Sequence, residues 1–111
     1  MKDEILSHLH DILQAGKAIK GFIAGSTFDQ YSSNELLRSG VERKLEIIGE
    51  ALSRIKRDEP ELLQKIREYR DIISFRNILV HGYSTIDDRI VWAIVDEDLD
   101  NLLKDVGNLL Q

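Results

Sequence analysis

The sequence predicts an all-α protein, and two observations carry that prediction: apolar residues recur at helical spacing, and helix-breaking residues are rare. The 111-residue chain contains one Pro, at position 60, and seven Gly that are scattered along it. Pro interrupts helices because it lacks a backbone donor, so a chain with a single Pro can run in long helices. No segment shows the alternating pattern of a half-buried strand. We therefore expect one domain covering residues 1–111, folded as an antiparallel bundle of four to five helices.

Four helical segments are expected along the chain. They cover residues 2–24, residues 34–56, residues 60–80, and a last region from 85 or 87 to the C-terminus. A break near residues 68–70 and a kink near 96–98 fit the pattern of the last two segments. The second segment has a long apolar stripe at spacings of four and three, formed by Leu37, Val41, Leu45, Ile48, Leu52 and Ile55. Such a stripe is typical of a helix in a bundle.

Turn and capping residues predict the boundaries of these helices. Residues 25–33, GSTFDQYSS, are small and polar and are typical of a loop. Ser32 or Ser33 is expected to cap the second helix, because Ser32-x-x-Glu35 has capping-box form. The remaining boundaries are assigned to Pro60 at the start of the third helix, Gly82 at its end, and Asp87 or Thr85 at the start of the last.

Gly40 and Gly49 lie inside the second predicted helix, where Gly is unfavourable. A neighbouring backbone that comes close to the helix would explain why no side chain is present there. We therefore expect close helix contacts at both positions.

Composition narrows the class of protein. Hydrophobic residues make up 42% and charged residues 32%, as in a folded globular domain. The absence of Cys excludes disulfides, thiolate metal sites and a Cys nucleophile, and it is compatible with the cytoplasm. The segment MKDEILSHLH lacks the apolar core of a signal peptide, and no apolar run is long enough to span a membrane. We expect a cytoplasmic protein that makes no membrane contact.

Charge is unevenly distributed along the chain. The net charge of −5 argues against a protein that coats nucleic acid in general. Residues 38–57 nevertheless contain six basic and three acidic residues, whereas residues 84–111 contain two basic and seven acidic ones. The basic segment could contact a phosphate chain at one place, or it could simply be a solvated helix face.

The third predicted helix breaks its own apolar pattern. Positions 72, 73, 76, 79 and 80 form one stripe at helical spacing, and four of them are Ile, Ile, Leu and Val. The fifth is Arg76. A guanidinium in a buried stripe is unfavourable unless it is paired or opens to a cleft. Local patterns that fail in this way concentrate at functional sites.

His81 follows Arg76 by five residues, about 140° around a helix. Ser74, Asn77 and His81 then form a polar seam beside the apolar stripe. Arg76 and His81 flank a strip of helix without pointing at each other. A second copy of the helix across a two-fold axis would bring two Arg and two His around one cleft.

This residue pair suits RNA cleavage without a metal. A His titrates near neutral pH, so His81 could take the proton from a ribose 2′-OH or protonate the departing 5′ oxygen. The planar fork of Arg76 could stabilise the charge on a five-coordinate phosphorus. Asn77 could orient His81 or bind a phosphate oxygen. Such a mechanism needs the 2′-OH, so DNA should not be cleaved.

A structural interpretation of the same residues stands beside this one. Arg76 could be a salt-bridge partner of Glu46 or Glu50, and His81 could be a C-terminal helix residue favoured by the helix dipole. Glu46 and Glu50 lie one turn apart and are expected to pair with Arg76, Arg43 or Arg54. If the second helix faces the cleft, one of the two carboxylates would order Arg76.

Three parts of the sequence resemble the HepT-like branch of the HEPN superfamily. They are the segment Arg-Asn-x3-His-Gly-Tyr at residues 76–83, the run Glu-Ile-Ile-Gly-Glu-Ala at 46–51 and the stretch Asp98-Leu99. The resemblance extends over nearly the whole chain. It implies a HEPN-like helical bundle that forms a two-fold homodimer, with the Arg-x4-His helices facing one another.

The resemblance also implies an activity and a partner. Many members are metal-independent endoribonuclease toxins that need no cofactor, paired in type VII-like toxin–antitoxin systems with a nucleotidyltransferase of the minimal (MNT) type. In the Arg-x4-His-x-Tyr subgroup, that partner silences the RNase by transferring AMP from ATP onto the motif tyrosine. Carried over, Arg76 and His81 are the catalytic pair, Asn77 is auxiliary and Tyr83 is the modified residue. Without the resemblance, Tyr83 would be interpreted as a packing aromatic.

Two other functions remain open from the sequence. The chain could be a non-catalytic helical partner that docks a minimal nucleotidyltransferase and helps it bind nucleotide, or a plain structural dimer. The complete motif favours the RNase, because a docking domain has no need of a general base. His8 and His10 face different directions on a helix and make a poor metal pair, and Trp92 is expected in the core or in a dimer interface.

Overall fold

The computed structural model describes residues 2–67, 69–81 and 86–111, with the side chains of 78–81 left out. Helices and short connections make up the whole of these ranges, so the predicted all-α class is confirmed. The elements are α1 (Asp3–Ile23), α2 (Phe28–Ser32), α3 (Glu35–Asp58), the 3-10 helix η1 (Pro60–Lys65), α4 (Tyr69–His81), α5 (Asp88–Ala93), the π-helical turn η2 (Ile94–Asp98) and α6 (Leu99–Leu109). None of these helices is long and apolar enough to cross a membrane.

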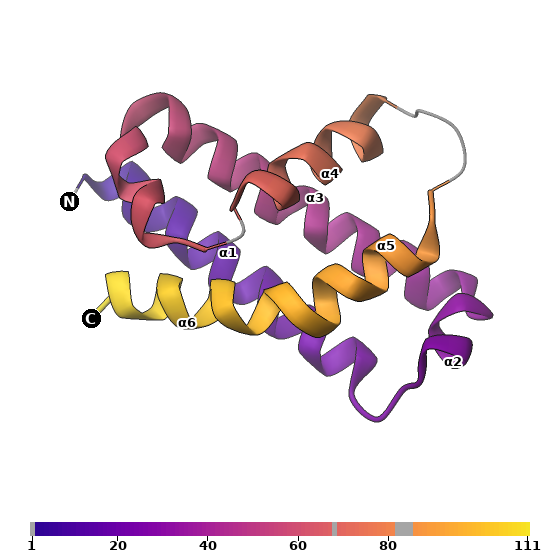
Figure 1. Cartoon of the computed structure of the whole chain (residues 1–111). Helices are drawn as coiled ribbons and strands as arrows, with labels where there is room; N and C mark the ends of the chain where they lie inside the picture. The colour runs from indigo at the N-terminus through magenta and orange to yellow at the C-terminus, as the bar shows by residue number, and fades with distance from the viewer. Residues whose placement is uncertain (1, 68, 82–85) are drawn as a thin grey trace.

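Helices α1 and α3 form the main antiparallel pair of the bundle (Figure 1). Helix α4 runs back along α3, which is its principal neighbour, and the continuous helical stretch from α5 through α6 crosses back over α1. The N- and C-termini therefore lie on the same side of the molecule (Figure 1). This arrangement places α3 at the centre, with α1 on one flank and α4 on the other.

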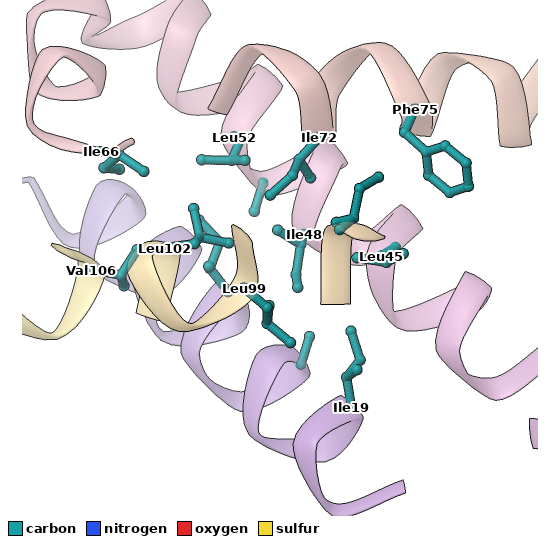
Figure 2. Packing of buried hydrophobic residues seen from close by; sticks show 14 of the residues in the cluster. Ile19, Leu45, Ile48, Leu52, Ile66, Ile72, Phe75, Leu99, Leu102 and Val106 are labelled. Atoms are coloured by element: carbon teal, nitrogen blue, oxygen red, sulfur yellow. The ribbon is translucent and has the colours of Figure 1, made fainter. Parts of the chain in front are cut away.

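The apolar stripe predicted for the second helix forms the centre of the core. Val41, Leu45, Ile48, Leu52 and Ile55 are all buried. In Figure 2, Leu45, Ile48 and Leu52 of this stripe lie among buried side chains of the other helices, which include Ile19, Ile72, Phe75, Leu99, Leu102 and Val106. Burial of each such side chain is worth about 1.5–3 kcal/mol, which makes this packing the main force holding the helices together.

The segment 25–33, expected as a loop, contains the short helix α2. Thr27 caps it by accepting a hydrogen bond from the Gln30 amide at 3.2 Å, while the Gln30 side chain accepts from the Thr27 amide at 2.9 Å. The turn is held from outside as well, because the Tyr31 ring is buried with its centroid 5.4 Å from that of Trp92. The loop expectation was wrong because it missed the capping box of Thr27 and Gln30, and because the contact of Tyr31 with Trp92 spans the sequence.

The expected cap of the second helix was also wrong. Asn34 is the N-cap of α3, and its side chain accepts a hydrogen bond from the Leu37 amide at 3.0 Å. Ser32 instead donates its hydroxyl to Asp88 at 3.1 Å, and Ser33 donates to the Asp29 carbonyl at 2.8 Å. Both serines belong to the end of α2, so they are not free to cap the helix that follows.

The third predicted helix is divided into two. Pro60 starts η1 in its first turn, as expected, and the chain becomes extended at Ile66 before α4 begins at Tyr69. The break thus comes next to the predicted position of 68–70. Arg67 anchors this break to α6, because its backbone amide, Nε and Nη2 all donate to the Asp105 carboxylate at 2.9–3.0 Å.

The last predicted helix begins and bends where expected. Asp87 caps α5 by accepting a hydrogen bond from the Arg89 amide at 2.9 Å. The predicted kink near 96–98 corresponds to the π-helical turn η2, which ends at Asp98. Such turns are typical of bends within long helices. Thr85, the other candidate cap, and Gly82, the expected end of α4, lie outside the described residues.

Candidate functional site

The candidate site is built where α4 crosses α3, and the crossing depends on Gly49. A Cβ added at Gly49 would lie 2.3 Å from Cβ of Arg76, 2.7 Å from its Cγ and 3.3 Å from the Ile72 carbonyl oxygen. The missing side chain therefore lets the stem of Arg76 lie directly on the α3 backbone. The predicted close approach is confirmed at Gly49. At Gly40 it was wrong, because the nearest atoms belong to the Phe22 ring at the ordinary distance of 3.5 Å.

Arg76 resolves the conflict in the apolar pattern by reaching over α3 to the surface. Its side chain is 23% exposed, and the hydrogen bond from Nη1 lies at the surface. Nη2 donates to the carboxylate of Glu50, and Nη1 donates to the side-chain oxygen of Asn77 at 3.1 Å. Nε is buried with no partner in the described part of the chain.

Two carboxylates, Glu46 and Glu50, were predicted as partners of Arg76, and in the structure Arg76 pairs with Glu50. Its second oxygen accepts a hydrogen bond from Nε of Arg54 at 3.1 Å, so Glu50 is shared between two guanidinium groups. Glu46 forms its ion pair with Arg43 at 3.3 Å instead. The expected pairs of these glutamates with arginine are thus found, one turn apart along α3.

The other residues of the motif helix are only partly placed. Ser74 and Asn77 are both exposed, as expected for the polar seam, and Ile72 is buried. Phe75, which the expected stripe did not include, is buried as well. His81 is the last residue of α4, about 7.5 Å along the helix axis from Arg76, but its side chain lies outside the described residues. Tyr83 lies outside them altogether.

A hollow of about 290 Å³ lies between α1 and α3, and Glu50 lines it together with residues of α3 on both sides of Glu50. Its wall contains five ionisable side chains besides Glu50, which are His8, Asp11, Arg43, Glu46 and Arg54. Arg43 and Arg54 were expected as partners of glutamates and as part of the basic segment 38–57, and His8 was not expected in a site. The spacing of residues 43, 46, 50 and 54 on one face of α3 was the signal that could have placed them together.

A second polar cluster holds the start of α5, which follows the segment that contains Tyr83. The Asp88 carboxylate accepts a hydrogen bond from Ser32 and lies 3.9 Å from Nε of Arg38. Arg38 also donates to the Ser32 carbonyl. Burial and the nearby charge of Asp88 raise the pKa of Glu42. This cluster fixes the point at which the chain returns from the motif helix to the core.

Comparison with known proteins identifies the family. A model of the HepT-like ribonuclease family matches residues 12–109. The chain is 33% identical over 105 residues to "Putative RNase MJ1380" of Methanocaldococcus jannaschii, covering 95% of each chain. It is also 33% identical over 102 residues to "Probable ribonuclease HepT" of Thermococcus cleftensis, covering 92% of each. No solved structure gives a significant match. These matches confirm the resemblance that the motif indicated, and the names of the relatives support an RNA-cleaving activity. The chain belongs to the HepT-like ribonuclease family.

Proposed function

We propose that this chain is a metal-independent endoribonuclease toxin of a type VII-like toxin–antitoxin pair, acting in the cytoplasm. The observation that carries the proposal is the placement of Arg76. Its stem lies on Gly49, and its guanidinium reaches the surface in a helix that ends five residues later at His81. Family membership supplies the substrate class, since the named relatives are ribonucleases.

The proposed chemistry uses the ribose next to the scissile phosphate. The 2′ oxygen attacks phosphorus and the bond to the 5′ oxygen breaks. His81 takes the proton of the 2′-OH and water protonates the 5′ oxygen, or His81 protonates the 5′ oxygen and water takes the 2′-OH proton. Arg76 stabilises the added negative charge at phosphorus through its donor fork. Asn77, which already accepts a hydrogen bond from Arg76, assists in orienting the phosphate. The products are a 2′,3′-cyclic phosphate and a 5′-hydroxyl.

A two-fold homodimer completes the proposed site. Helix α4 packs mainly on α3, so it has a further face that a second copy could cover. Pairing two α4 helices across a two-fold axis would place two Arg76 and two His81 around one cleft. A site composed of both copies would be inactive in the monomer.

Silencing is proposed to occur at Tyr83, by AMP transfer from ATP through a cognate MNT-type nucleotidyltransferase. The phenol oxygen of Tyr83 would attack the α-phosphorus of ATP, and pyrophosphate would leave. Tyr83 follows His81 by two residues, so the attached phosphate and purine would compete with RNA for Arg76. The nucleotidyltransferase is thus both a partner and the antitoxin.

The deciding experiment is RNA cleavage by the purified, unmodified chain in excess chelator, beside His81→Ala and Arg76→Lys. Wild type should cleave RNA and spare DNA. Both variants should lose about 100-fold or more, since Lys keeps the charge of Arg76 but lacks its fork. Circular dichroism confirms that the variants are folded. If protein with an unmodified Tyr83 mass cleaves nothing, the chain is the non-catalytic partner of a nucleotidyltransferase instead.

A further inference from the structure

Two arginines from different helices point at one carboxylate in this structure. Nε of Arg54 on α3 and Nη2 of Arg76 on α4 each donate to a different oxygen of Glu50. The position between them is therefore already shaped for an anion with two acceptor oxygens. A phosphodiester has the same charge and offers two such oxygens, and arginine forks match phosphate as well as carboxylate.

The three side chains are accessible to a ligand. The exposed fractions are 51% for Arg54, 39% for Glu50 and 23% for Arg76. The Arg54–Glu50 ion pair is exposed on both sides, and pairs of this kind contribute little to stability, so a competing anion can replace Glu50 beside Arg54 at small cost. The hollow of about 290 Å³ that Glu50 and Arg54 line gives the Glu50 side chain room to move away from the two guanidinium groups.

We infer that Arg54 is a second phosphate-binding residue of this protein, and that the Glu50 carboxylate occupies, in the free protein, the position of an RNA phosphate held between Arg54 and Arg76. The inference rests on the proposed function for its ligand, a single-stranded RNA backbone. When RNA binds, the phosphate takes the two guanidinium groups and Glu50 turns into the hollow.

The test measures binding and not cleavage, so that it stays independent of catalysis. The probe is a fluorescent single-stranded RNA of mixed sequence with every ribose methylated at the 2′ oxygen, which blocks the attack on phosphorus. Its affinity for the full chain is measured by anisotropy across a range of salt concentrations. The variants are Arg54→Ala, Arg54→Lys and Glu50→Gln. The matched control is Arg57→Ala on the same helix, whose side chain is 70% exposed and pairs with Asp58.

Arg54→Ala should weaken binding about tenfold, as expected for one charge-assisted contact. It should also reduce the slope of log affinity against log salt by about 0.7, the contribution of one phosphate contact on a single strand. Arg54→Lys should restore the slope because it restores the charge. Glu50→Gln should tighten binding, since the competing anion is removed.

Equal affinities and slopes for Arg54→Ala and Arg57→Ala would overturn the inference, and so would weaker binding by Glu50→Gln. Absence of binding by wild type would overturn it as well. By contrast, a chain that binds this RNA through Arg54 but cleaves no natural RNA would contradict the proposed RNase alone.

Discussion

Gly49 on α3 and Arg76 on α4 are in direct contact, with room for a hydrogen atom and nothing larger between them. A Cβ at position 49 would lie 2.3 Å from Cβ of Arg76, far inside contact distance. The atom in the way is the fixed root of the Arg76 side chain and not its flexible end, and the Ile72 carbonyl is close behind at 3.3 Å. The path of α4 and the exit of the Arg76 guanidinium are therefore determined together at one glycine.

Gly49→Ala should lower the free energy of unfolding by about 1–3 kcal/mol, since the overlap exceeds the gain in helix propensity. Chemical denaturation measures the change. Gly21→Ala in α1 is the control, because a Cβ there meets nothing within 4 Å. That change should be neutral or stabilising by up to about 1 kcal/mol. Equal effects at both glycines would show that the α3–α4 contact is not tight.

Asp105→Asn should destabilise the protein by about 1 kcal/mol at neutral pH, because it removes the charge that pairs with Arg67 and replaces one of the two acceptor oxygens by an NH2 group. The hydrogen bond from Arg67 holds the pKa of Asp105 below its usual value. The hydrogen bonds between Arg67 and ionised Asp105 therefore stabilise the protein at pH values above the unfolded pKa of about 3.9. This stabilisation is lost as the pH falls through the folded pKa of Asp105. Denaturation curves at a series of pH values should show wild type and variant converging in acid.

The control for that series is Asp100→Asn, also on α6. Asp100 is 65% exposed and pairs only with Lys20 on α1 among the contacts of the described residues. Loss of the Asp100–Lys20 ion pair should change the free energy of unfolding by less than about 0.5 kcal/mol. A larger effect at Asp100 than at Asp105 would contradict the anchoring role of Arg67.

Glu42→Gln should stabilise the protein at pH 7. Burial, with the charge of Asp88 added to it, raises the pKa of Glu42, so the folded state disfavours the ionised carboxyl. The protonated group contributes stability below the unfolded pKa of about 4.3, and this contribution is lost as pH rises through the folded pKa. The advantage of the variant, followed by thermal unfolding, should therefore shrink as the pH is lowered towards 4.

Glu61→Gln serves as the comparison, since Glu61 is exposed in η1. Its unfolding should follow wild type throughout the pH series. A Glu42→Gln variant that is less stable than wild type at pH 7 would mean that attraction by the nearby charge of Arg38 outweighs burial.

Tyr83→Phe should leave RNA cleavage unchanged and make it resistant to silencing, because the phenol oxygen that would accept AMP is gone. The measurement is cleavage before and after incubation with ATP and the cognate nucleotidyltransferase, with the mass of the chain read in parallel. Tyr69→Phe, at the start of α4, is the matched control and should be silenced like wild type. Silencing of Tyr83→Phe would place the modification elsewhere.

Local pattern was sufficient for the main helices. The stripe from Leu37 to Ile55 predicted α3 correctly, because helical periodicity depends only on residues within one or two turns. Arg76 was recognised by the same logic, as the one residue that broke the stripe. The all-α class and the close approach at Gly49 were also predicted from local pattern, whereas the family was predicted from the resemblance of the motif at residues 76–83.

Tertiary structure decided what distant segments do to one another. Helix α2 depends on the packing of Tyr31 against Trp92, which lies far away in the sequence. Glu46 and Glu50 are equally good candidate partners of Arg76 in the sequence, because they lie one turn apart on the same helix. Only the position at which α4 crosses α3 makes Glu50 the partner of Arg76. The sequence by itself thus determined the main helices and the residue that breaks their pattern. The fold alone determined which side chains meet, because a crossing point depends on packing across the whole bundle.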